Sequence, residues 1–329
     1  MLFDLPLAEL RDYRPQLDEP ADFDQFWADT LEATRAYPLA ASFEPVADSL
    51  LRTVDVFDTS FAGFGGDRIA AWLLLPKHRG GVPLPCVVQY IGYGGGRGLH
   101  HEWLDWSAFG YAHLIMDTRG QGSTWRSGDT RDAGAGLAGP HSPGFLTLGL
   151  PERDDYYYRR VYADAVRAVE AAQSHPDVDA RRVIVTGGSQ GGGISIAAAT
   201  LADNVVAAMP DVPFLSHFRR AVDLADQEPY GELLRWCRVH VDLAEQAFAA
   251  LSYFDVAILG RRSSVPALFS VGMHDPICPP STVYAAYNSY GEGAGSPVSK
   301  DIRVWPYHEH EGGEARQREE QARWLRTIL

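Results

Sequence analysis

The sequence predicts an α/β protein in which a mostly parallel central sheet is flanked by helices. Strand-like and helix-like segments alternate along most of the 329 residues, as in parallel βαβ units. A glycine-rich turn at 187–193 joins a β-branched run to a small-residue helix and carries a serine. The length permits a large core, and 46% hydrophobic with 22% charged residues is ordinary for a globular protein.

The expected elements follow one another in a regular order. A helix is expected at 22–37, where aromatic residues recur at helical spacing, and a hairpin at 51–76. Further strands are expected at 86–91, 112–117, 182–186, 205–209, 267–271 and 302–305. Further helices are expected at 158–174, 191–201, 280–290 and 314–328.

Two long stretches interrupt this alternation. Residues 123–157 are rich in Gly, Pro and charged residues and are too long for a simple connection. Residues 214–262 lie between two expected strands and have a mostly helical pattern. Long excursions at strand ends commonly cover a site or form subunit contacts. We therefore expect residues 1–329 to form a single domain with insertions at about 123–157 and 214–262.

Charge and cysteine content exclude several classes of partner and cofactor. The chain has 43 acidic and 29 basic residues, a net charge of −14, which argues against nucleic-acid binding. Its three cysteines are far apart and form no CxxC pair, so neither a disulfide framework nor a zinc site is expected. The first residues lack the pattern of a signal peptide, and no run of 18 apolar residues occurs. We expect a cytoplasmic protein without a membrane partner.

Ser189 is the strongest candidate for a catalytic residue. It lies at the centre of a Gly-Gly-Ser-Gln-Gly turn between a strand and a helix, as does the nucleophile of the α/β-hydrolase fold. A serine in such a turn is strained and stands at a helix N-terminus, whose dipole favours developing negative charge. The G-x-S-x-G pattern also arises by chance in glycine-rich turns, but its place between strand and helix favours the catalytic interpretation.

A catalytic serine needs a base and an acid, which in this fold follow it in the order acid, then histidine. Asp275 comes directly after a strand, whereas its rival Asp255 has no clear strand before it. His308 and His310 both follow the last strand, and position alone favours His310 without excluding His308. Two such histidines could also share a metal ion, but no third ligand is evident, so no metal is expected.

Acyl transfer also needs two backbone N–H groups that stabilise the oxyanion of the tetrahedral intermediate. One should come from Gln190, the residue after the nucleophile, and the other from the Gly-Tyr-Gly-Gly-Gly turn at 92–96. This turn resembles a dinucleotide-binding fingerprint, but the third required glycine falls on Arg97 or Leu99. An oxyanion turn fits better, and no cofactor is expected.

Seven segments of the chain match one known family. They are Arg119–Gln121, Tyr156–Arg160, Gly187–Gly191, Asp211–Phe214, Leu251–Asp255, Cys278–Thr282 and His310-Glu311. On these segments the chain closely resembles carbohydrate esterase family 7, the acetyl xylan esterase and cephalosporin C deacetylase group of the α/β-hydrolases. The resemblance extends from about residue 85 to the C-terminus, and the expected N-terminal helix and hairpin agree with it.

The resemblance assigns roles to the candidate residues. It implies that His310 is the base, Asp275 the acid and Tyr93 the second oxyanion donor beside Gln190. It implies a serine esterase with a Ser-His-Asp triad and an acetyl-enzyme intermediate. The implied substrates are small acetyl esters, such as acetylated xylo-oligosaccharides and cephalosporin C. It further implies a homo-hexamer with a subunit-interface loop in 123–157.

Two other functions fit the sequence less well. A prolyl-oligopeptidase-like peptidase usually carries a propeller domain, for which this chain has neither room nor repeats. A catalytically silent scaffold would not need a nucleophile, an acid and a base in the order that this chain presents.

Overall fold

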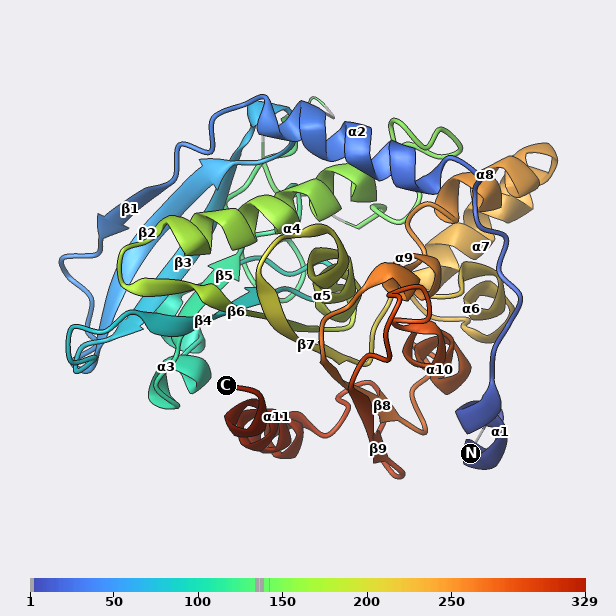
Figure 1. Cartoon of the computed structure of the whole chain (residues 1–329). Coiled ribbons are helices and arrows are strands. Elements are labelled where there is room, and N and C mark those ends of the chain that lie inside the picture. The colour runs from blue at the N-terminus through green and yellow to red at the C-terminus, as the bar shows by residue number, and fades with distance from the viewer. Residues whose placement is uncertain (1–2, 134–135, 137–138, 142) are drawn as a thin grey trace.

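The computed structural model describes residues 3–133, 136, 139–141 and 143–329. A nine-stranded sheet with the order β1-β2-β3-β5-β4-β6-β7-β8-β9 runs through the molecule (Figure 1). From β5 to β9 in this order all neighbours are parallel, and β1, β2, β3 and β5 pair antiparallel. The strands are β1 (Ser42–Pro45), β2 (Val54–Ala62), β3 (Arg68–Pro76), β4 (Leu84–Tyr90), β5 (Ala112–Met116), β6 (Val178–Gly188), β7 (Val205–Asp211), β8 (Ala267–Gly272) and β9 (Lys300–Trp305).

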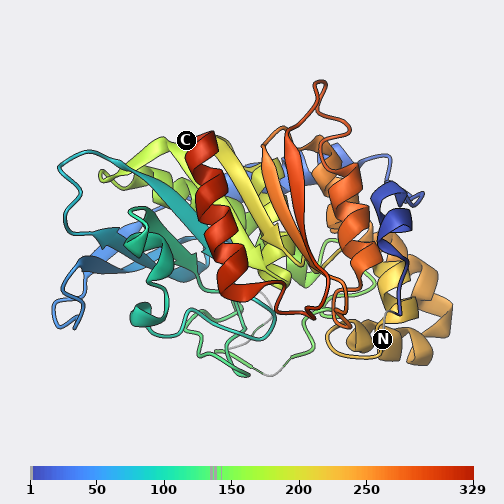
Figure 2. The same ribbon diagram turned by 90° about the horizontal axis from the view of Figure 1, so that it is seen from below.

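Helices cover both faces of this sheet. α2, α4 and α5 lie on one face, and α3 and α11 lie on the opposite face, where α11 crosses the strands (Figures 1 and 2). The helices are α1 (Leu7–Asp12), α2 (Phe23–Arg35), α3 (Asp105–Ala108), α4 (Tyr157–Ser174), α5 (Gln190–Leu201), α6 (Phe218–Leu224), α7 (Tyr230–Val239), α8 (Ala244–Leu251), α9 (Val256–Leu259), α10 (Pro280–Ser289) and α11 (Glu314–Ile328).

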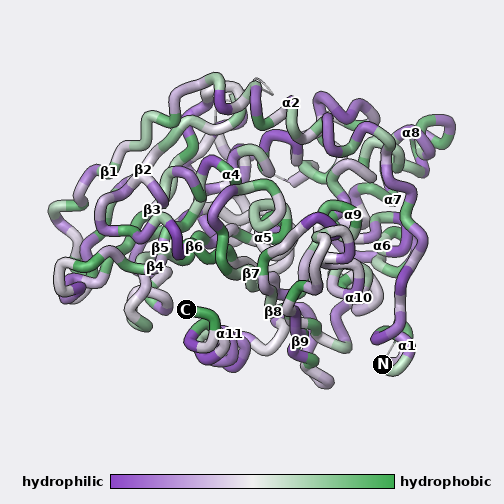
Figure 3. The backbone as a smooth tube through the Cα atoms, viewed as in Figure 1, coloured by the Kyte–Doolittle hydropathy of each residue, from purple (hydrophilic) through white to green (hydrophobic). Residues whose placement is uncertain are grey.

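The central strands are apolar on both faces because helices cover both. Every residue of β5 and of β8 is buried, so neither strand shows the alternation of a half-exposed sheet. Hydrophobic residues concentrate along the central strands, and hydrophilic residues follow the outer helices (Figure 3). On the α11 side a separate apolar cluster includes Trp106 and Leu325.

The architecture confirms the expected fold class, and each strand and helix expected from the sequence is present, most of them with boundaries shifted by a few residues. The largest shift is in β6, which begins at Val178 rather than 182. The short elements α1, β1 and α3 were not predicted. β1 and α3 have four residues each, too few to show a period.

Both excursions leave the sheet at the carboxyl ends of strands. Residues 123–157 follow β5 and contain no strand among their described residues. Residues 214–262 follow β7 and contain α6 to α9, as their mostly helical pattern predicted. Strands before and after each excursion belong to the same sheet. That the two are insertions in a single domain stays a prediction.

One stretch of the second excursion has the length and composition of a membrane-spanning helix. It covers Val241–Arg262, but 61% of its apolar window is buried inside the fold. The stretch is divided between α8 and α9 rather than forming one continuous helix. Core helices of folded proteins pass the same test of length and composition, so this stretch is weak evidence for a membrane span.

Candidate active site

Ser189 stands at the junction of β6 and α5 in a strained conformation. Its backbone has φ 57° and ψ −118°, an unusual region for a residue with a side chain. Its N–H donates to the carbonyl of Asp211 at 2.9 Å, and its carbonyl accepts the N–H of Phe214 at 2.9 Å. These two bonds hold the strained turn against β7 and the chain that follows it.

Glycines beside Ser189 allow α5 to lie very close to its neighbours. A Cβ on Gly191 would lie 2.2 Å from the carbonyl oxygen of Tyr90 in β4, and one on Gly193 would lie 2.3 Å from that of Phe214. Because backbone atoms occupy both positions, a larger residue would displace the first turn of α5. Gly191 and Gly193, which both follow the serine, are therefore required by packing.

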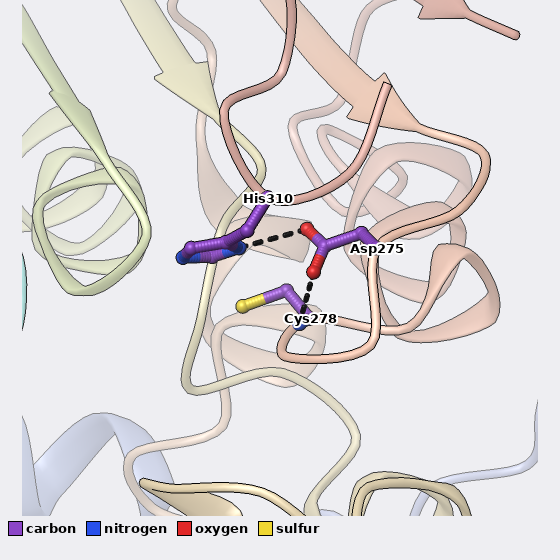
Figure 4. Close-up of side chains that lie close together, drawn as sticks. All are labelled: Asp275, Cys278 and His310. Carbon is purple, nitrogen blue, oxygen red and sulfur yellow. Dashed lines mark hydrogen bonds and ion pairs between the residues drawn. The ribbon is translucent and has the colours of Figure 1, made fainter. Parts of the chain in front are cut away.

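The structure brings His310 and Asp275 together (Figure 4). Nδ1 of His310 lies 2.8 Å from Oδ2 of Asp275. The carboxylate is fully buried, and its other oxygen accepts the N–H groups of Ile277 and Cys278, each at 2.9 Å. Three hydrogen bonds therefore hold the carboxylate in the orientation in which Oδ2 contacts the imidazole.

The rival residues make different contacts. Asp255 caps α9 by accepting the N–H of Ala257 at 2.9 Å, and it also accepts the N–H of His217 at 3.0 Å. Burial raises the pKa of Asp255 to about 6. His308 lies 3.0 Å from the Glu311 carboxylate instead of Asp275. Geometry therefore distinguishes His310 from His308, which spacing in the sequence did not.

The glycine turn after β4 lies beside the serine elbow, where a Cβ on Gly92 would be 3.8 Å from the carbonyl oxygen of Gly188. The N–H of Gly95 donates to the carbonyl of Gly92 at 3.2 Å and closes the turn. The carbonyl of Tyr93 accepts the indole N–H of Trp125 at 2.8 Å. The peptide that follows Tyr93 is thus held by a residue of the 123–157 excursion.

Gln121 connects this turn to the serine elbow. Its Oε1 accepts the N–H of Gly94 at 2.7 Å, and its Nε2 donates to Oε1 of Gln190 at 2.8 Å. Gln190 is the first residue of α5, where backbone N–H groups have no partner within the helix. The two segments expected to supply oxyanion donors are therefore joined by one buried side chain.

A cavity of about 770 Å³ opens onto these residues. Ser189, His310 and Tyr93 line it together with the aromatic side chains of Trp103 and Trp125. Pockets that bind small molecules typically have volumes of about 300–1,000 Å³. The cavity is thus large enough for a substrate of which the acyl group is a small part.

Sequence reasoning did not assign Cys278 to the site. Its thiol lies within 4.8 Å of the ligand atoms of Asp275 and His310. Burial raises the pKa of this thiol well above its usual value, so the sulfur keeps its proton. A metal ion there would need the thiolate and would compete with the Asp275–His310 bond. That no metal is resident stays a prediction.

Asp211 is a second, partly buried carboxylate that lines the cavity, and the sequence did not assign it to the site. Its oxygens accept Nε2 of Gln317 at 2.9 Å and Nε2 of Gln321 at 2.7 Å, both from α11. Burial raises its pKa to about 6. The bonds join α11 to the end of β7, next to the serine elbow.

Comparison with known families gives the classification. Residues 1–328 match the family model described as acetyl xylan esterase. The chain belongs to the acetyl xylan esterase family. As a member of this family it is a carboxylic ester hydrolase, and both the resemblance and the α/β-hydrolase fold inferred from the sequence are confirmed.

Solved structures and a curated protein agree with this family. An acetyl xylan esterase from Paenibacillus sp. R4 is 37% identical, with a TM-score of 0.89 over 99% of this chain and 100% of that one. Acetyl xylan esterase 1 from Thermoanaerobacterium sp. JW/SL YS485 is 31% identical, with a TM-score of 0.85 over 99% and 98%. Acetyl esterase Axe7A of Xylanibacter ruminicola is 29% identical over 303 residues, 90% of this chain. The match spans only 65% of the length of that relative.

Proposed function

We propose that the protein is a serine esterase that removes acetyl groups from small esters, such as acetylated xylo-oligosaccharides and cephalosporin C. The proposed triad is Ser189, His310 and Asp275. The observation that carries the proposal is the 2.8 Å contact between His310 Nδ1 and Asp275 Oδ2, beside a cavity that Ser189 and His310 both line. The names of the relatives, acetyl esterase and acetyl xylan esterase, support acetyl as the acyl group.

In the first step Oγ of Ser189 attacks the ester carbonyl carbon while Nε2 of His310 takes the hydroxyl proton. Asp275 accepts Nδ1–H, so that Nε2 is the free nitrogen, and it stabilises the imidazolium that forms. When the C–O bond of the ester breaks, His310 gives the proton to the departing alcohol. The acetyl group remains on Ser189 as an ester.

In the second step water attacks the acetyl-enzyme while His310 takes a proton from it. Collapse of the intermediate breaks the bond to Ser189 Oγ, which recovers its proton from His310, and acetate leaves. The N–H groups of Tyr93 and Gln190 are the proposed oxyanion donors in both steps. Each such donor is typically worth about 10²–10³ in rate.

The test is hydrolysis of matched p-nitrophenyl acetate, butyrate and octanoate by the wild type and by Ser189→Ala. We expect acetate to be hydrolysed fastest, rates to fall steeply with chain length, and the variant to be inactive. A fluorophosphonate probe should label the wild type and not the variant. Activity that survives in Ser189→Ala would refute the triad, and a preference for octanoate would refute the acetyl assignment.

We also propose that the protein assembles as a homo-hexamer with the 123–157 excursion at subunit contacts, and that it is cytoplasmic. The hexamer rests on the family resemblance. Light scattering after size-exclusion chromatography tests the first, and a monomer would contradict it. Fractionation of expressing cells tests the second, and recovery in the membrane or medium would contradict it.

A further inference from the structure

We infer that Glu232 is a positioning residue, which holds the oxyanion donor Tyr93 in its active orientation through a hydrogen bond from the Tyr93 phenol. The inference rests on the proposed function, since it takes the backbone N–H of Tyr93 as an oxyanion donor. Glu232 lies on α7, in the 214–262 excursion, far in sequence from the turn that it would control.

The Tyr93 phenol is bonded to both excursions. It lies 2.8 and 2.7 Å from the two carboxylate oxygens of Glu232, to which it donates. Its oxygen also accepts the N–H of Phe145 at 2.9 Å and the N–H groups of Gly144 and Leu146, each at 3.3 Å. Leu146 N–H is also 3.2 Å from Glu232 Oε2. The phenol therefore joins α7 and the loop at 144–146 to the glycine turn.

The direction of these bonds is fixed by protonation. Burial, together with the nearby Glu232 carboxylate, raises the pKa of the Tyr93 phenol far above its usual value, so the phenol keeps its proton. Only an acceptor at position 232 can then receive the phenol hydrogen. When the acceptor is an ionised carboxylate, the bond is charge-assisted and roughly twice as strong as a neutral one.

The turn around Tyr93 needs such restraint because its backbone is inherently permissive. Gly92 precedes Tyr93, and Gly94, at φ 77°, follows it. The phenol is held by Glu232 at one end, and the carbonyl of the same residue is held by Trp125 at the other. With the side chain and the following peptide both held, the rotation that would turn the N–H of Tyr93 away from the site is restrained.

Orientation of this N–H matters to the transition state more than to the bound ester. An oxyanion donor contributes only if it is aligned with the oxygen on which charge develops. Loss of the Glu232 bond should therefore lower kcat and leave KM nearly unchanged. A residue that merely stabilised the covering segments would instead alter the melting temperature or KM.

The experiment compares Glu232→Gln, Tyr93→Phe and the double variant with the wild type on p-nitrophenyl acetate. Glutamine keeps the shape of the side chain but offers a single acceptor oxygen where the phenol and Leu146 N–H both need one. Phenylalanine keeps the ring, which packs against Phe145 and Phe214, and removes only the hydroxyl. The matched control is Glu245→Gln in the same excursion, whose carboxylate is exposed and pairs with Arg219.

We expect kcat to fall about tenfold or more in each single variant, a partial loss of what one oxyanion donor supplies. The double variant should lose no more than the worse single variant, because Glu232→Gln weakens the same bond that Tyr93→Phe removes. Inhibition by phenylboronic acid, whose adduct with the serine carries an oxyanion-like oxygen, should weaken by the same factor. Glu245→Gln should match the wild type.

Several outcomes would overturn the inference. One is a wild-type kcat in Glu232→Gln, and another is a change in KM with no change in kcat. An unchanged inhibition constant for the boronic acid, or additive losses of kcat in the double variant, would also overturn it. If Glu232→Gln melts early, Glu232→Asp, which keeps the charge, and Tyr93→Phe still decide the matter. Failure of the proposed function itself is recognised separately, since Ser189→Ala would then remain active.

Discussion

Asparagine at position 275 should abolish catalysis while leaving the fold largely intact. The Oδ1 atom of the asparagine still accepts the N–H groups of Ile277 and Cys278, which lie 2.9 Å from the native oxygen. Its amide nitrogen replaces Oδ2 at 2.8 Å from Nδ1 of His310 and donates where the carboxylate accepted. The imidazole then carries its proton on Nε2 and can no longer take the proton of Ser189.

The same change of tautomer in another serine hydrolase lowers kcat by about 10⁴, or about 5.5 kcal/mol of transition-state stabilisation. We expect a loss of this order in Asp275→Asn. The free energy of unfolding should change by less than about 2 kcal/mol, because one buried hydrogen bond is altered and two are kept. The assay is kcat on p-nitrophenyl acetate, together with urea unfolding of the same preparation.

Asp255→Asn is the matched control, since Asp255 is also buried and also accepts backbone N–H groups. It should retain wild-type kcat because its bonds cap α9 and do not reach His310. The reasoning would be refuted if Asp275→Asn kept more than about a tenth of kcat, a loss of only about 1.4 kcal/mol. It would equally be refuted if the control lost as much activity as Asp275→Asn.

Three further outcomes follow from buried polar groups. Arg119→Met should lower the free energy of unfolding by about 3–5 kcal/mol. The Asp164 carboxylate, 2.6 Å from Arg119 Nε, is then left buried without a counter-charge and keeps only the N–H of Phe64 at 2.8 Å. An unchanged urea midpoint would contradict this. Burial raises the pKa of Asp211 from 3.8 to about 6, so the folded protein binds this proton more tightly than the unfolded chain does. The free energy of unfolding should therefore fall by about 3 kcal/mol as pH rises from about 4 to about 6. In Asp211→Asn this part of the pH dependence of urea unfolding should vanish, and an unaltered slope would argue against it. Gln121→Leu removes the oxygen that accepts the Gly94 N–H at 2.7 Å. Since an unsatisfied buried donor costs about 1–3 kcal/mol, kcat on p-nitrophenyl acetate should fall about tenfold or more. A wild-type kcat would show that the turn does not need this bond.

The sheet and the serine elbow could be predicted because their signals are local. A β-branched run, a glycine turn and a small-residue helix within about twenty residues define the β6–α5 junction. The class of the sheet follows from the alternation of strands and helices. By contrast, α3 has four residues and β1 four, so neither leaves a periodic signal.

The partners of site residues could not be predicted where tertiary packing brings them together. Glu232 lies 139 residues from Tyr93 in sequence, and nothing in its own surroundings marks it. His308 and His310 are both placed after the last strand, and their spacing does not say which imidazole turns toward Asp275. That choice depends on how the loop after β9 meets the loop after β8, which is a matter of three-dimensional contact.

The close approach of α5 to its neighbours limits how an engineer could alter substrate preference. Gly191 lies against the Tyr90 carbonyl and Gly193 against that of Phe214, so randomising these codons would yield clones with a displaced helix. Diversity is better introduced in the cavity wall, for example at Ile277, whose side chain is not part of the elbow. A library designed in this way keeps the geometry of Ser189 constant while varying the shape presented to the ester.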